Sequence, residues 1–113
     1  WVAERLADTA PGPRAAAAEA LASLGDRGQF FASALAQRLA DPAEVTAVRL
    51  AVIRALGGMG ERGAVYGDLV EMFLQDPLPE LQQAARQSLL QMGRAVPGGA
   101  ILPIQGGGGG ELE

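Results

Sequence analysis

The chain has 113 residues, of which 49% are hydrophobic, enough for one small domain with a buried core. It has 22 alanines and 16 glycines but no Cys, His, Lys or Asn, which excludes the usual zinc sites, disulfides, imidazole bases and lysine Schiff bases. The net charge of −4 argues against a nucleic-acid-binding surface or an electrostatic membrane anchor. We therefore expect no catalytic residue, metal site or cofactor.

Three related blocks follow one another along the chain, over residues 5–28, 38–63 and 73–95. Each block contains an Asp in a turn and closes on a glycine, and both features recur after 33 to 35 residues. The aspartates are Asp8, Asp41 and Asp76, and the closing glycines are Gly25, Gly60 and Gly93. A period in the mid-thirties with helical patterning is typical of an α-solenoid.

Each block is expected to hold two helices, because its apolar residues recur at steps of three and four. In chain order, the predicted helices cover about residues 2–7, 13–24, 30–40, 45–59, 65–75 and 79–92. The turn Asp41-Pro42-Ala43-Glu44 is similar to a capping box with Asp41 as N-cap. The three closing glycines follow the second helices, where a left-handed residue commonly ends a helix.

The motif of Asp-Pro, Val/Arg, Ala-Ala, Ala-Leu and Leu/Met-Gly resembles HEAT repeats, and more narrowly the bacterial HEAT-like repeats of phycobilin lyases. The resemblance covers about residues 1–96. It implies an all-α fold, an α-solenoid of about three helix pairs (six helices) in a right-handed superhelix. The implied repeats are about 1–28, 29–63 and 64–96.

In that family, the turn Asp and an Arg near the start of the second helix tend to form ladders between adjacent repeats. By resemblance, the ladder residues here are Asp8, Asp41, Asp76, Arg14 and Arg49. Gln82 stands where a third arginine would be, so that rung would be neutral. Arg14 and Arg49 could instead bind an anion or a carboxylate of a partner protein, although the ladder is the favoured interpretation.

Two other candidate sites are better explained as ordinary helix features. Asp68 and Glu71 are three residues apart on one predicted helix face, but no nucleophile or orienting group accompanies them, which favours a solvated face. The glycine-rich stretch 57–63 lacks the GK[ST] ending and the preceding strand of a nucleotide-binding loop. It is better interpreted as a helix end followed by a turn.

Residues 97–113 form a Pro/Gly-rich tail outside the repeats, which we expect to be flexible, disordered or partly capping. Its apolar segment Ile101-Leu102-Pro103-Ile104 could fold back over the last repeat, serve as a linear motif for a partner, or do neither.

The repeats and the scarcity of reactive side chains favour a non-enzymatic protein-protein interaction scaffold, the C-terminal part of a larger HEAT-repeat protein. Its partner would be another protein, with no nucleic acid and no membrane contact. Outward-facing residues of the second helices, including Arg54, Arg86 and Glu19, are the expected partner surface. By family resemblance, the alternative is a regulatory or lyase-like module associated with an enzyme or transporter. Neither a signal peptide nor a membrane-spanning run is visible in the sequence, which favours the cytoplasm.

Overall fold

The computed structural model describes residues 2–96, in which every regular element is a helix and no strand occurs. The first pair consists of η1 (Val2–Ala7) and α1 (Pro11–Ala22). The second consists of η2 (Gly25–Phe31) and α2 (Ala32–Ala40), followed by α3 (Thr46–Gly57). The third consists of α4 (Gly60–Ala64), α5 (Gly67–Glu71) and η3 (Met72–Gln75), followed by α6 (Pro79–Gln91). Trp1 and residues 97–113, and with them the expectations for the tail, lie outside the described residues.

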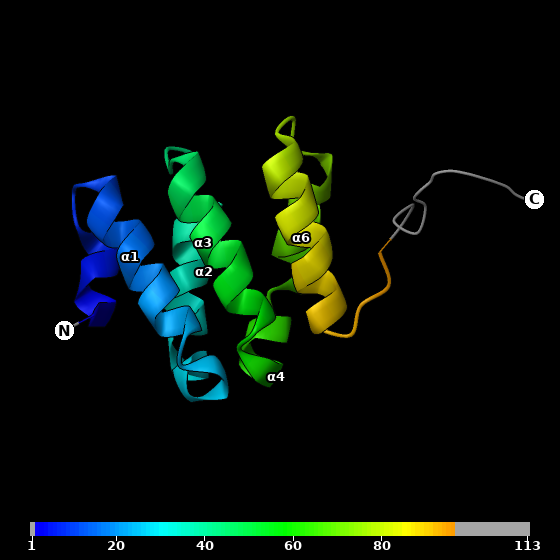
Figure 1. Ribbon diagram of the computed structural model, residues 1–113, viewed down its shortest axis with the longest axis horizontal. Coiled ribbons are helices and arrows are strands. Elements are labelled where there is room, and N and C mark those ends of the chain that lie inside the picture. Colours follow the sequence, from blue (N-terminus) through cyan, green and yellow to red (C-terminus); the bar gives the residue numbers. More distant parts are fainter. Residues whose placement is uncertain (1, 97–113) are drawn as a thin grey trace, which may run out of the picture.

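The three helix pairs stack into two layers, which confirms the predicted α-solenoid. Figure 1 shows α1, α3 and α6 side by side in one layer, with α2 behind α3 in the other. The second helix of each pair therefore packs against the second helix of the next, as α1 does with α3 and α3 with α6. Within residues 2–96, no helix combines the length and the apolar character needed to cross a bilayer.

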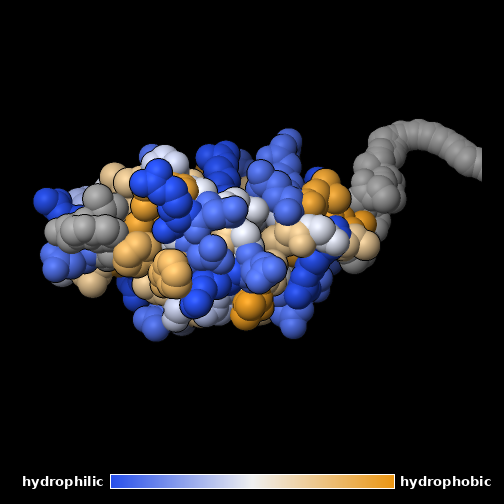
Figure 2. Space-filling view, turned by 90° about the horizontal axis from the view of Figure 1, so that it is seen from below, coloured by the Kyte–Doolittle hydropathy of each residue, from blue (hydrophilic) through white to orange (hydrophobic). Residues whose placement is uncertain are grey.

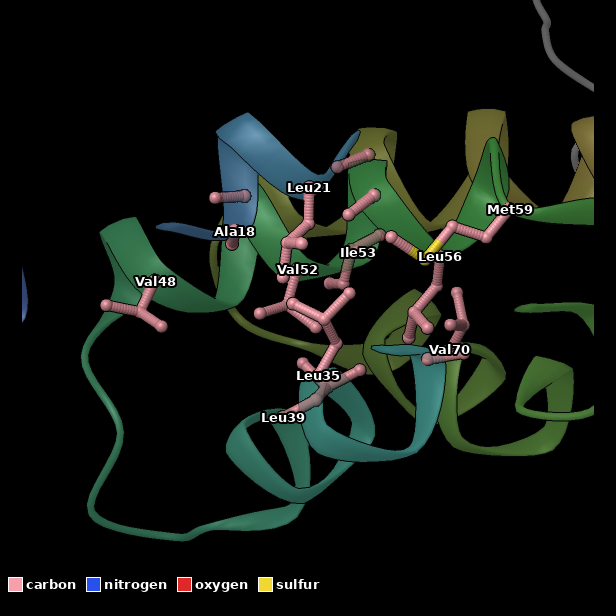
Figure 3. Close-up of a cluster of buried hydrophobic side chains, with 14 of the residues drawn as sticks. Ala18, Leu21, Leu35, Leu39, Val48, Val52, Ile53, Leu56, Met59 and Val70 are labelled. Atoms are coloured by element: carbon pink, nitrogen blue, oxygen red, sulfur yellow. The ribbon is translucent and has the colours of Figure 1, made fainter. Parts of the chain in front are cut away.

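The core lies between the two layers and follows the predicted apolar steps. Val48, Val52 and Leu56 repeat at intervals of four along α3 and are fully buried. Leu35 and Leu39 of α2 point toward them, and side chains from α1 and α5 complete the cluster (Figure 3). Burying each large aliphatic side chain contributes about 1.5–3 kcal/mol to the free energy of folding.

The three closing glycines have the left-handed backbone predicted for them. The φ angles of Gly25, Gly60 and Gly93 are +57°, +64° and +83°. A residue with a Cβ is strained in this region, so glycine suits the turn that follows the end of each second helix within two or three residues. These angles confirm the periodic glycine as a structural part of the repeat.

The second helices match their predicted positions within two residues, but the first helices are more broken than predicted. The expected helix at 30–40 begins with the 3₁₀ segment η2, and the expected helix at 65–75 is divided between α5 and η3. The third repeat also approaches other segments closely at two glycines, because a Cβ at Gly63 would collide with the Leu56 carbonyl and one at Gly67 with the Arg94 side chain. These glycines weaken helix formation where the chain must approach its neighbours.

The predicted capping box at Asp41 is wrong. Helix α3 starts at Thr46 with Val45 as its N-cap residue, so Asp41 and Glu44 both precede the helix. The Asp41 carboxylate instead accepts a hydrogen bond from the Ala43 N–H at 2.8 Å, and Glu44 accepts one from the Val45 N–H at 2.9 Å. The Glu44 carboxylate also binds Arg14 of the preceding repeat.

Candidate functional site

The turn aspartates stabilise their own turns. Each carboxylate accepts a hydrogen bond from the N–H two residues further on, at 2.8–2.9 Å. The aspartates are Asp8, Asp41 and Asp76. This local bond is an Asx turn, which fixes the loop that leads into the second helix.

In each repeat, a side chain near the start of the second helix also donates a hydrogen bond to the backbone of this Asp turn. Arg14 donates to the Asp8 carbonyl at 2.7 Å, and Arg49 donates to the Asp41 carbonyl at 3.0 Å. In the third repeat, the amide of Gln82 donates to the Asp76 carbonyl at 2.5 Å. All these bonds lie within a repeat and end on backbone oxygens, so they differ from the expected carboxylate ladder between repeats. Gln82 can replace arginine because a carbonyl needs only a hydrogen-bond donor.

The ion pair between the first and second repeats uses an acid that the sequence analysis did not place in the ladder. Arg14 binds both carboxylate oxygens of Glu44, at 2.7 and 3.0 Å, and the Glu44 side chain is only 1% exposed. Arg38 lies 3.8 Å from the same carboxylate. One signal could have found Glu44: it lies three residues after the turn Asp, where the other repeats have Pro11 and Pro79.

The environment of Glu44 keeps it ionised. Burial by itself would raise the pKa of this carboxyl group, because it penalises the charged form. The hydrogen bonds from Arg14 and from the Val45 N–H, together with the positive charges of Arg14 and Arg38, outweigh burial and hold the pKa below its usual value. The hydrogen bond to Glu44 also raises the pKa of Arg14.

Asp68 and Glu71, considered above as a paired-carboxylate site, share one cation. Arg94 donates to Asp68 at 2.7 Å and to Glu71 at 2.9 Å, and these bonds raise the pKa of the guanidinium. The interaction ties the segment after α6 to α5. Within residues 2–96, no three His, Cys, Asp or Glu side chains are grouped so as to hold a metal ion.

A groove runs along the outer surface between α3 and α6. It consists of two adjacent hollows of about 420 and 280 Å³ that share Arg54, Ala84 and Gln87 as lining residues. The larger hollow is also lined by Ser88, Leu90 and Gln91, and the smaller one by Leu50, Glu80 and Gln83. We call these nine residues the α3–α6 groove.

The predicted partner surface is only partly present in this groove. Arg54 is exposed at its centre, and Glu19 is exposed on the neighbouring helix α1. Arg86 is half-buried and lines neither hollow, and its Nε is buried without a hydrogen-bond partner in the described part of the chain. Arg86 occupies the repeat position of Ala18 and Ile53, which are fully buried, so it does not share a surface with Arg54.

A second, smaller surface lies on the edge formed by the turns. Phe30 and Val65 hold the same position in successive repeats, and they are 69% and 72% exposed. The Arg62 guanidinium lies 4.5 Å from the centre of the Phe30 ring, beside a hollow of about 170 Å³ that Tyr66 also lines. Figure 2 views this edge and shows separate hydrophobic patches among hydrophilic groups.

Comparison with known proteins identifies the family of this repeat. The family model described as HEAT repeats matches residues 1–90, which is most of the chain. A search of curated proteins found no match.

Proposed function

Because the chain belongs to the HEAT-repeat family, we propose that it is a non-enzymatic scaffold that binds another protein through the α3–α6 groove. HEAT repeats are commonly protein-interaction scaffolds. The repeat domain would span residues 1–96, with repeat boundaries near residues 28 and 63.

The groove is the single observation that carries this proposal. It lies on the face of α3 and α6 that remains after their buried faces have packed against the first helices and against each other. It combines an exposed arginine, several amides and two leucines, a mixture suited to polar contacts around apolar anchors. The two helices α3 and α6, which pack against each other, carry all of these side chains.

A large side chain that fills the groove tests the proposal, because it blocks any partner segment, whatever the charge of that segment. Gln87 is exposed and lines both hollows, so Gln87→Trp should block the groove without disturbing the core. The matched control is Gln37→Trp, an exposed position on α2. In a pull-down from cells, the unsubstituted protein and the control should retain the same partner, and Gln87→Trp should lose it.

Thermal unfolding should show that both tryptophan variants remain folded, so that a lost partner reports on the groove. Retention of the same partner by Gln87→Trp would contradict the proposed site. Substrate turnover by a protein that retains no partner would contradict the scaffold itself.

A further inference from the structure

Arg54 is a cation whose charge the repeats leave available. Arg14, Arg38 and Arg94 are each paired with acids within the chain. Arg54 is exposed on α3, and no ion pair joins it to any residue in the range 2–96. Arg54 lines both hollows of the α3–α6 groove. A guanidinium in a groove binds a carboxylate most strongly, because the two planar groups form paired hydrogen bonds.

The α6 side of the groove carries a row of hydrogen-bonding side chains. Gln83, Gln87 and Gln91 follow one another at intervals of four and line the groove, so their side chains form a row along α6. Each amide both donates and accepts hydrogen bonds, which matches the alternating N–H and C=O groups of an extended chain. Leu50 and Leu90 add apolar contact in the smaller and larger hollows, respectively.

The acids near Arg54 limit how much negative charge a ligand can carry. Glu80 lines the smaller hollow but forms no ion pair with Arg54 within the described residues. Glu19 occupies on α1 the repeat position that Arg54 occupies on α3, so it lies on the adjacent helix of the same layer. A second carboxylate would be repelled by Glu80 if it lay in the smaller hollow, and by Glu19 only if the segment reached across α3 toward α1.

We propose that the α3–α6 groove binds an extended segment of a partner protein that carries a single carboxylate, with that carboxylate on Arg54. The inference rests on the proposed scaffold function and names the class of its partner segment. A neutral segment would lose the charge-assisted contact, and a polyacidic one would gain repulsion from Glu80.

Nuclear magnetic resonance can test this preference, because the chain has no Asn and its side-chain amide signals all come from glutamines. The probes are three blocked seven-residue peptides of glycine, serine and leucine that carry one central glutamate, one central glutamine or three glutamates. The peptide with one glutamate should shift the signals of Gln83, Gln87 and Gln91 and bind about fivefold more tightly than the glutamine peptide. The peptide with three glutamates should bind no more tightly.

Arg54→Gln should remove the preference for the single glutamate, whereas the exposed control Arg27→Gln should keep it. Equal binding of the glutamate and glutamine peptides, tighter binding of the triple-glutamate peptide, or an unchanged preference in Arg54→Gln would each overturn the inference. The proposed function would survive those results if Gln87→Trp still lost the cellular partner, because that substitution blocks the groove for any occupant.

Discussion

The two junctions between repeats are built around the same arginine position but use different partners. At the first junction, Arg14 forms a paired interaction with the buried carboxylate of Glu44. At the second junction, Arg49 lies 5.6 Å from the centre of the Phe73 ring. Both arginines also bind the carbonyl of their own turn Asp. The comparison shows that the arginine at this repeat position binds its own turn in both repeats, and that its other partner is a side chain of the repeat that follows.

Two positions of the following repeat make the difference. In the second repeat, Arg38 and Glu44 lie three residues before and three residues after the turn Asp. In the third repeat, those positions are Phe73 and Pro79, so the acid is missing and a ring takes the place of a cation. The second junction also has its own close contact, in which the Ser88 hydroxyl donates to the Ile53 carbonyl at 2.7 Å.

The largest expected effect is at the close helix contact of the second junction. A Cβ at Gly57 would meet the Ser88 hydroxyl and lie 2.9 Å from the Ser88 Cα, which is backbone and cannot move alone. We expect Gly57→Ala to lower the free energy of unfolding by about 2–3 kcal/mol, measured by urea denaturation. Gly12→Ala is the control, since nothing lies within 4 Å of a Cβ there. Equal stability of the two variants would show that α3 and α6 can move apart at this contact without a measurable loss of stability.

The next effect is at the ion pair of the first junction. Glu44→Gln keeps the shape of the side chain but removes the charge that Arg14 and Arg38 share. We expect the free energy of unfolding to fall by about 1–2 kcal/mol at neutral pH. The exposed acid Glu61, changed to Gln, should alter it by less than about 0.5 kcal/mol. If Glu44→Gln were as stable as the parent, the attraction within the ion pair would only offset the cost of burying its charges.

Acid should remove the contribution of Glu44. Its pKa is lowered in the folded protein, so the stabilisation is present above its ordinary value of 4.5 and is lost as pH falls through the lowered folded value. Urea denaturation at pH 7, 5 and 3 should therefore show a shrinking difference between the parent and Glu44→Gln. A difference of the same size at pH 3 would assign it to packing rather than to charge.

The smallest effect is expected at the aromatic contact of the second junction. Phe73→Leu keeps an apolar side chain at this buried position but removes the ring beneath Arg49. We expect a loss of about 1 kcal/mol in the free energy of unfolding, from the reduced volume and the lost cation–π contact. Because no carboxylate takes part, the loss should be the same at pH 7 and pH 3. A loss that depends on pH would remove the contrast between the two junctions.

Local sequence signals determined the repeat itself. The periodic Asp, the apolar steps and the closing glycines set the second helices within two residues and the left-handed backbone at Gly25, Gly60 and Gly93. These features can be predicted from the sequence because each depends on residues a few positions apart, as in the hydrogen bond of a turn or the end of a helix. The same signals placed Glu19 and Arg54 on the outer surface of the second helices.

Only the tertiary structure decided which charges meet and where a groove forms. Glu44 contacts an arginine thirty residues earlier, and Arg86, predicted to share a surface with Arg54, lies half-buried away from the groove. The close approach of Gly63 and Gly67 to other segments is likewise a feature of the tertiary structure. Spacing along the chain cannot settle these points, because they depend on how one repeat packs against the next.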